Sequence, residues 1–565
     1  MNFKALLYKV TLFAALLVVS GCEEHLTRPP LDQMTDETYW TNEENVRTFS
    51  WGFYPGFFTG YGSGFTWGAY FSGQSLNDDF APTNPPQFTE NVPTSGGGWG
   101  FANVRKANIF IDRVQGVDMA PEAVEHWTGV GRFFRGLQYH LLVRSFGDVP
   151  WYDEVLEEDD ERLYKPRDPR TVVMDNVLSD FKYAAEHVRE SDGEDGLTVN
   201  RYVVLAYMSR AFLFEGTFLK YHDIDQQKAE EYLKEAKWAA DQIIQSGNYQ
   251  VSDNYREMFN SLSLAGNPEM ILYRKYEIGV LTHALNSYNN REPQTGVSKN
   301  AIESYLASDG LPISISPAYQ GDRSIEDVMA NRDPRLRETI VPELRLNGVV
   351  SNYSTSGYAT HKFLNEEIKD LPEGSSNLNP TDAPVIRYGE VLMNYAEAAA
   401  ELGTLTQEDL DKSINQLRAR GEGVVPPLQV IGGQPAVNGA VYDDPKRDPD
   451  VSPLLWEIRR ERRTELMMEG FRLNDLRRWK KLDYADTVEN PDINRGAWVD
   501  RNDYPDLQAD VTLDGEGEQG YIVPSTQQQS QRRLYDERVY LNPIPINQIT
   551  LYRDNGAELS QNPGW

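Results

Sequence analysis

The sequence predicts an all-α protein with at least one tetratricopeptide-like helix pair and with long, loop-rich stretches between its helices. Apolar residues recur at steps of three and four through residues 388–402, which places them on one face of a helix. Phe133, Leu137 and Leu141 mark another helix. By contrast, residues 52–100 hold many glycines, prolines and aromatics, and long loops inside a helical protein are usually binding elements or disordered.

The clearest helix pair covers residues 200–246. Residues 202–214 are apolar on nearly all sides, as in a helix buried inside a protein. Residues 229–244 are amphipathic, and this second helix should end at Gly247, which suits a left-handed C-cap. The pair has roughly the length of a tetratricopeptide repeat, and its small alanines fit a close helix crossing.

Glycine and proline indicate where other helices end. The helix through Leu137 should stop at residues 146–150, where the chain reads Phe-Gly-Asp-Val-Pro, because a residue before proline is disfavoured in a helix. The C-terminal tail, residues 542–565, is expected to be extended rather than helical. Three internal stretches are expected to be loops: residues 345–385, 421–452 and 485–530.

The N-terminus has the layout of a secretory signal. Lys4 and Lys9 precede a short apolar run, residues 10–19, which is below the about 20 residues that span a bilayer. Small residues then lead to Cys22, the only cysteine of the chain, as in the lipobox of a bacterial lipoprotein. We expect residues 1–21 to be a lipoprotein signal peptide, Cys22 to be lipidated and residues 22–30 to be a spacer. The alternative is a simple secretory signal with an incidental cysteine.

Composition narrows the classes of function. The net charge is -31, from 86 acidic and 55 basic residues, and such a surface repels nucleic acid and anionic membranes. A single cysteine excludes intrachain disulfides and a thiolate zinc site. Tyrosine and tryptophan, at 31 and 11 residues, suit sugar or peptide recognition, although most of them are expected to pack in the core.

The sequence contains no catalytic signature. It lacks a Gly-x-Ser-x-Gly elbow, a His-Glu-x-x-His motif and a Walker loop. Acidic residues are too numerous to single out the carboxylate pair of a glycosidase. Asp514, Glu516 and Glu518 alternate in a glycine-rich stretch, which is a weak indication of a structural calcium ion and fits an acidic surface turn better. No other cofactor is indicated.

A basic segment, residues 458–481, stands out in this acidic chain. A nucleic-acid site is one interpretation. Interleaved acids at helical spacings, including Glu461, Glu465 and Asp475, favour internal ion pairing instead.

This segment also carries a family resemblance, together with other motifs in the same order along the chain. The motifs are Leu-Asp at 31–32, Tyr-Trp at 39–40, RFFRG at 132–136, FGDVP at 146–150, RDPR at 332–335, IRYGEVLMNYAEA at 386–398, IRRERRTELMMEGFRLNDLRRW at 458–479, PIP at 543–545 and QNPGW at 561–565. This combination resembles the SusD/RagB family and spans nearly the whole chain after the signal peptide.

The resemblance implies an all-α fold in which tetratricopeptide-like helix pairs stack as an α–α superhelix and an irregular, loop-rich face binds the ligand. It implies a SusD-like N-terminal region at 31–250 and a RagB/SusD region at 251–565. It implies a lipid-anchored protein of the outer membrane that faces the cell exterior and is not an enzyme. Such proteins act as a lid on a SusC-like TonB-dependent transporter and deliver captured oligo- or polysaccharide to it. A peptide-capturing lid is the first alternative, and a surface glycoside hydrolase is the second.

The resemblance also suggests which residues contact the ligand. In the family, contacts come largely from stretches that match residues 61–103 and 276–300 here. Sugar C–H groups pack on indole faces, and carboxylates accept hydrogen bonds from paired hydroxyls. The candidates are Trp67, Tyr70, Asp78, Asp79 and Trp99 from the first stretch, and Tyr288, Asn289 and Arg291 from the second. For each aromatic residue a packing role is the alternative, most of all for Trp99.

Overall fold

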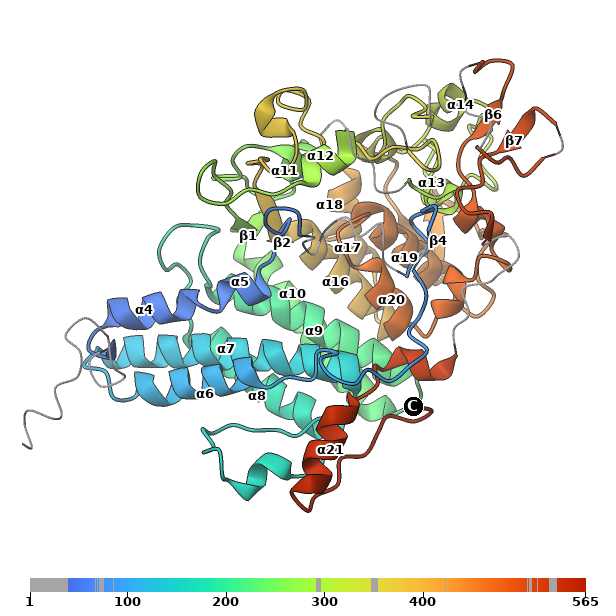
Figure 1. The fold of residues 1–565 in the computed structure, drawn as a ribbon. Helices are drawn as coiled ribbons and strands as arrows, with labels where there is room; N and C mark the ends of the chain where they lie inside the picture. Colours follow the sequence, from blue (N-terminus) through green and yellow to red (C-terminus); the bar gives the residue numbers. More distant parts are fainter. Residues whose placement is uncertain are drawn as a thin grey trace, which may run out of the picture.

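The protein is mostly helical, with packed helix pairs and a few small sheets (Figure 1). A computed structural model describes residues 39–565 apart from residues 67, 69, 71–75, 85, 291–295, 347–353, 422, 506, 508–510, 516 and 528–535. The expected signal peptide, Cys22 and the spacer therefore lie outside the described residues, as do the candidates Trp67 and Arg291. Within the described part of the chain, none of the helices has the length and apolarity needed to cross a bilayer.

Long antiparallel helices form the N-terminal half, and α6, α7 and α8 lie side by side in Figure 1. The predicted pair at 200–246 is confirmed, because α9 and α10 pack along each other. The helices of this half are α4 (Glu43–Trp51), α5 (Tyr54–Phe57), α6 (Ala102–Val114), α7 (Pro121–Phe146), α8 (Arg170–His187), α9 (Arg201–Tyr221) and α10 (Gln226–Ser246), with the short 3-10 helix η1 (Glu161–Tyr164).

The helix ends follow the local signals. The Asp225 side chain accepts a hydrogen bond from the Lys228 N–H at 2.9 Å and caps the start of α10. Gly247 ends α10 with φ 68 and ψ 10, the left-handed conformation that glycine adopts at little cost. Gly147 ends α7, also at positive φ. Both predicted stops are confirmed.

The C-terminal half combines shorter helices with loops. The helix predicted through residues 388–402 is confirmed as α16, which is buried along most of its length. The elements are α11 (Glu257–Asn260), α12 (Leu285–Asn290), α13 (Lys299–Ser304), α14 (Ile325–Met329), α15 (Arg335–Thr339), η2 (Pro372–Gly374), α16 (Tyr388–Glu401), α17 (Gln407–Asp411), α18 (Ile414–Arg418), α19 (Pro453–Glu465), α20 (Arg472–Arg478), η3 (Leu482–Ala485), η4 (Pro491–Asn494), η6 (Glu537–Tyr540) and α21 (Ile546–Asp554).

Small antiparallel sheets interrupt the stretches expected to be loops. Strand β1 (Met270–Arg274) pairs with β2 (Ala383–Arg387), and Tyr273 lies opposite Pro384. Strands β3 (Gln429–Ile431), β4 (Gln434–Val437) and β5 (Ala440–Val441) form one meander, and β6 (Trp498–Asp500) pairs with β7 (Gln519–Tyr521). These strands are two to five residues long, too short for alternating hydrophobicity to identify them in the sequence.

The expectation of an extended C-terminal tail is wrong, because the tail contains α21. Pro545 is the N-cap of this helix. Proline is tolerated at a helix start, since its missing N–H would have no partner there. The prolines of this tail therefore mark where the helix begins rather than excluding it.

One large hydrophobic core joins the two expected regions of the chain. It contains Phe133 and Tyr232 from the first region, and Leu392 and Ile458 from the second. The boundary expected at residue 250 stays a prediction.

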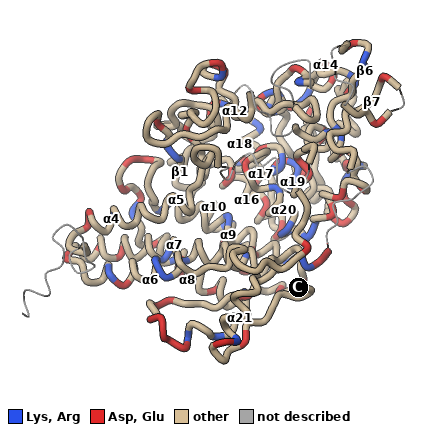
Figure 2. Tube along the Cα trace, viewed as in Figure 1, with Lys and Arg blue, Asp and Glu red and all other residues tan. Residues whose placement is uncertain are grey.

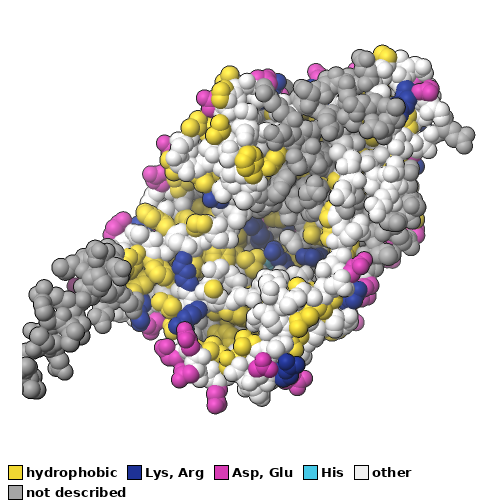
Figure 3. Space-filling view, in the orientation of Figure 1, with side chains coloured by type: hydrophobic (Ala, Val, Ile, Leu, Met, Phe, Trp, Pro, Cys, Tyr) yellow, Lys and Arg dark blue, Asp and Glu magenta, His cyan; other side chains and the backbone are white. Residues whose placement is uncertain are grey.

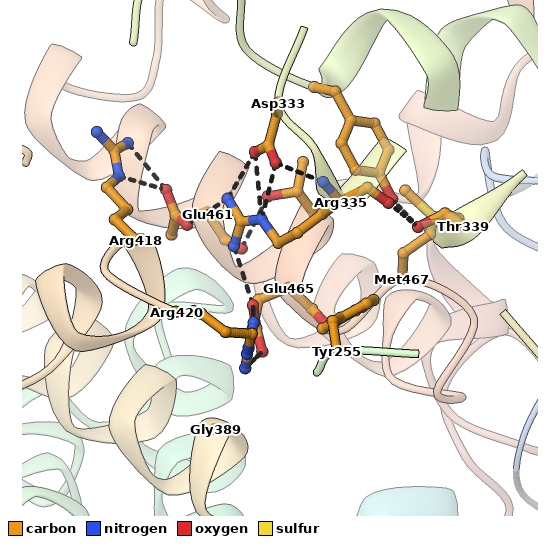
Figure 4. Close-up of polar contacts among 12 residues, drawn as sticks. Tyr255, Asp333, Arg335, Thr339, Gly389, Arg418, Arg420, Glu461, Glu465 and Met467 are labelled. Carbon is orange, nitrogen blue, oxygen red and sulfur yellow. Dashed lines mark hydrogen bonds and ion pairs between the residues drawn. The ribbon is translucent and has the colours of Figure 1, made fainter. Parts of the chain in front are cut away.

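Most arginines of the basic segment form ion pairs, which confirms ion pairing rather than nucleic-acid binding as their role. Its acids Glu461 and Glu465 pair with arginines from other parts of the chain (Figure 4). Arg335 contacts Glu461 at 2.7 Å and Glu465 at 2.9 Å. Arg420 contacts Glu465 at 2.8 Å, and Arg418 contacts Glu461 at the same distance. Figure 2 shows Lys or Arg and Asp or Glu positions close together around α19 and α20. Buried charges of this kind require partners, because desolvation costs each ion several kcal/mol.

Candidate functional site

The two stretches predicted to contact the ligand lie against each other. The Gly64 N–H donates to the Thr282 carbonyl at 2.8 Å. Phe80 and Val297 form a β-bridge, and the Ala81 N–H donates to the Gly296 carbonyl at 2.9 Å. Segments more than 200 residues apart in sequence therefore form one surface, as a shared site requires.

Tyr70 is buried at this junction. Its ring is 5 % exposed and meets the edge of Tyr61, with the ring centroids 5.4 Å apart. Burial raises the pKa of its hydroxyl well above the ordinary value. In this arrangement Tyr70 packs against its neighbours and offers no open face to a sugar.

Asp78 and Asp79 are buried in ion pairs with the basic segment. The Asp78 carboxylate accepts two hydrogen bonds from Arg472, both at 2.7 Å, and Asp79 accepts one from Arg463 at 2.9 Å. Burial by itself would raise the pKa of Asp78, but Arg463 and Arg472 outweigh it and lower that pKa to about 2. Burial raises the pKa of Asp79, and the charge of Asp78 adds to the rise. The pair fastens the N-terminal loop to α19 and α20.

Asp78 lies at the wall of a polar cavity of about 570 Å³. Asn300 also lines it, so both predicted stretches contribute to one cavity. Two half-buried aromatic side chains, Trp456 and Tyr484, share the wall with charged groups. A flat apolar face beside hydrogen-bonding groups is the chemistry that sugars require.

Both aromatic side chains are held in place by acids. The Trp456 indole N–H donates to Asp444 at 3.3 Å, and the Tyr484 hydroxyl donates to Asp448. Lys481 contacts Asp448 at 2.8 Å from the other side. These contacts fix the ring orientations before any ligand arrives, which lowers the entropy cost of binding.

Trp99 belongs to a different cavity. It is 8 % exposed and meets Phe101 and Phe146 edge to face, with centroid separations of 5.6 and 5.1 Å. It lines an apolar pocket of about 330 Å³ between α6 and α21, together with Tyr152 and Tyr552. The structure therefore separates Trp99 from the cavity at Asp78.

Tyr288 and Asn289 lie on α12, at the junction of the two stretches. The Tyr288 hydroxyl donates to the Phe65 carbonyl at 3.3 Å. The Asn289 amide donates to the Leu285 carbonyl at 2.6 Å, and its buried Oδ1 has no hydrogen-bond partner among the described residues. The contact roles of both residues stay predictions.

The acidic turn around Asp514 is held by protein groups. Asp514 contacts Arg495 at 2.8 Å and accepts a hydrogen bond from the Tyr521 N–H at 2.8 Å. Glu516 lies outside the described residues. In the described part of the chain, no three His, Cys, Asp or Glu side chains are grouped as metal ligands would be.

Sequence reasoning missed Trp456 and Tyr484. Trp456 lies just before the basic segment and Tyr484 just after it. The charges are the dominant pattern of this part of the sequence, and the two aromatic residues form no pattern of their own. The available signal was a tryptophan directly before the run of Arg and Glu residues that begins at Glu457.

Comparison with known proteins identifies the family. A model of the SusD family matches residues 235–565, more than half of the chain, so the protein belongs to the SusD family. This is a family of non-enzymatic proteins, in agreement with the lack of catalytic motifs in the sequence.

Individual relatives match at low identity over most of their length. SusD-like protein P38 of Formosa agariphila is 22 % identical, over 85 % of this chain and 92 % of the relative. Among solved structures, a SusD-like carbohydrate binding protein of Bacteroides fragilis matches with a TM-score of 0.66 and 22 % identity, over 92 % of this chain and 99 % of that one. Surface glycan-binding protein A of Bacteroides fluxus matches with a TM-score of 0.61 and 17 % identity, over 93 % and 100 %. At these identities the structures establish a shared fold.

Proposed function

We propose that this protein is a surface lipoprotein that captures oligo- or polysaccharide and delivers it to a SusC-like TonB-dependent transporter in the outer membrane. The observation that carries the proposal is membership of the SusD family. Two structures that match almost the whole chain are named for carbohydrate or glycan binding, which supports a glycan as the ligand.

We assign glycan binding to the polar cavity between Asp78 and Tyr484. It is large enough for a few sugar rings and open to solvent. Trp456 and Tyr484 would supply the stacking faces, while Asn300 and the Lys446 donors that Glu303 does not use would meet sugar hydroxyls. Asp78 acts indirectly, since Arg472 and Arg463 already occupy its oxygens and are themselves held in the wall by it.

Affinity electrophoresis against a panel of polysaccharides tests the function, and Trp456→Ala tests the site. We expect at least one glycan to retard the wild type and the variant to bind it roughly tenfold more weakly, because a buried aromatic contact is worth about 1.5–3 kcal/mol. Trp51→Ala is the control, since Trp51 is 44 % exposed on α4, and α4 lies far from α19 and α20, which line the cavity (Figure 1). Equal loss in both variants would remove the site assignment. Retardation by no glycan, with binding of peptides instead, would favour the peptide-capturing alternative.

Cys22 provides a separate test of anchoring. We expect Cys22→Ala to leave the folded body intact and to release it from the outer-membrane fraction, because two or more acyl chains are needed for firm attachment. Cell fractionation and circular dichroism of the released protein measure the two effects. Retention of the variant at the membrane in cells that lack the transporter would contradict the anchor.

A further inference from the structure

Three arginines from different helices lie near one another, and none of them lines the polar cavity. Arg144 lies on α7, Arg210 on α9 and Arg477 on α20, and α9 packs against both other helices. Figure 3 shows Lys and Arg side chains gathered in a hollow over α9 and α20. Such a concentration of positive charge is unusual in a chain with a net charge of -31.

Arg210 is the compensated member of this group. Its Nε and Nη2 donate to the two oxygens of Glu390, both at 2.6 Å. Its guanidinium also lies 4.6 Å from the ring centroid of Tyr207 and 5.2 Å from that of Phe471. The bidentate ion pair with Glu390 neutralises the charge of Arg210, and the two rings hold its guanidinium in place.

Among the described residues, Arg144 and Arg477 have no carboxylate or aromatic ring that balances their charge in this way. Neither guanidinium forms a hydrogen bond or ion pair within the described part of the chain, although both side chains are half-buried. The Nε of Arg477 is buried without a partner, and so is Nδ1 of the neighbouring His140 on α7. Buried polar atoms are almost always hydrogen-bonded in native proteins, so these two unpartnered buried atoms indicate a missing partner.

The electrostatics agree with the geometry. Burial lowers the pKa of Arg144 to about 10, and the charges of Arg477 and Arg210 add to the effect with no acid opposing it. Burial and the surrounding arginines also lower the pKa of His140 well below its ordinary value, so His140 is neutral. An anion between Arg144 and Arg477 would relieve this repulsion.

We infer that Arg144 and Arg477 form an anion site that receives the carboxylate or sulfate group of an acidic glycan. The inference rests on the proposed function, because it names the charge class of the captured glycan. Two guanidiniums with free forks suit a planar or tetrahedral oxyanion, which accepts several hydrogen bonds at once. The buried imidazole of His140 lies one helical turn before Arg144 on α7. The acidic surface as a whole disfavours anionic ligands, and the arginine pair reverses that preference locally.

Isothermal titration of the full-length mature protein tests the inference with three matched ligand classes: a sulfated, a uronic-acid and a neutral oligosaccharide. We expect at least one acidic class to bind, and Arg144→Gln and Arg477→Gln each to weaken it roughly tenfold or more, since a hydrogen bond to a charged group contributes about 1.5–3 kcal/mol. Which acidic class binds distinguishes sulfate from carboxylate. Arg553→Gln is the control, because Arg553 is 73 % exposed on α21 and its loss changes the net charge equally.

The outcomes separate the inference from the proposed function. If only neutral glycans bind, or if acidic ones bind equally to wild type, Arg144→Gln and Arg477→Gln, the anion site is wrong while the glycan function stands. If none of the sulfated, uronic-acid and neutral oligosaccharides binds, the proposed function itself fails. Equal weakening by Arg553→Gln would reduce the effect to net charge and would also overturn the site. Circular dichroism of each variant confirms that a loss of binding is not a loss of fold.

Discussion

Arg477 and Arg478 are neighbours in sequence and opposites in environment. Arg478 is 2 % exposed and donates to both oxygens of Glu397, at 2.6 and 2.7 Å, as well as to Asp475 at 3.0 Å. Arg477 has no side-chain partner among the described residues, and its Nε is buried alone. The difference separates two uses of buried positive charge. A fully paired arginine holds helices together, whereas an unpaired one is destabilised by desolvation and by repulsion from its neighbours, which an anionic ligand would relieve.

The largest expected effect on stability follows from breaking the ion pair between Arg478 and Glu397. Arg478→Gln would leave Glu397 buried without its main counter-charge, and removal of one partner of a buried pair costs about 3–5 kcal/mol. We expect the free energy of unfolding, measured by urea denaturation, to fall by that amount. Arg478→Lys should recover part of the loss, since it restores the charge but not the bidentate geometry. A loss below about 1 kcal/mol in Arg478→Gln would contradict the structural role of this face.

The stability that the Arg478–Glu397 ion pair contributes should also depend on pH. Burial would raise the pKa of Glu397, but Arg478, Arg462 and Arg459 outweigh it and lower that pKa from 4.5 to about 2. A carboxyl whose pKa is lowered on folding stabilises the protein at neutral pH and loses that contribution as pH falls from 4.5 through about 2. We expect the wild type to lose stability over this window and Glu397→Gln to show a shallower slope. Urea denaturation across a pH series measures it. Parallel slopes in the two proteins would show that other carboxylates account for the acid response.

The smallest effect on stability is expected from substitution of the unpaired Arg477. Arg477→Gln should change the free energy of unfolding by no more than about 0.5 kcal/mol, or should raise it, because no partner is lost and repulsion with Arg144 is relieved. Denaturation in chloride buffer without multivalent anions measures this. A loss as large as that of Arg478→Gln would mean that Arg477 has a structural partner after all, and the contrast between the two arginines would disappear.

Much of the helical frame could be predicted from the sequence, since its signals are local. The apolar spacing of residues 229–244 and the glycine at 247 define α10 and its end without reference to the rest of the chain. The same holds for Gly147 at the end of α7. The short strands and α21 were missed, because they are too short or too weakly amphipathic to produce a period in the sequence.

The candidate site was predictable only in part. The two stretches expected to contact a ligand do lie together, but the roles of their individual residues are not visible in the sequence. Asp78 illustrates the reason, since its ion pair with Arg472 spans 394 positions. Trp456 and Tyr484 enter the cavity because α19 and the segment after α20 meet there, which no local pattern reports.

By itself, the sequence determined the helical class, the helix boundaries marked by glycine, the SusD-family motifs and the balance of charge in the basic segment. The tertiary structure decided which charges are neutralised. Asp78, Glu397 and Glu465 meet their arginines only after distant helices pack, and the same packing brings the charge of Arg477 near Arg144 with no acid among the described residues to oppose it. The physical reason is the range of the forces involved. Helix formation depends on residues three or four positions apart, whereas the energy of a buried charge depends on every group that folding brings to its side.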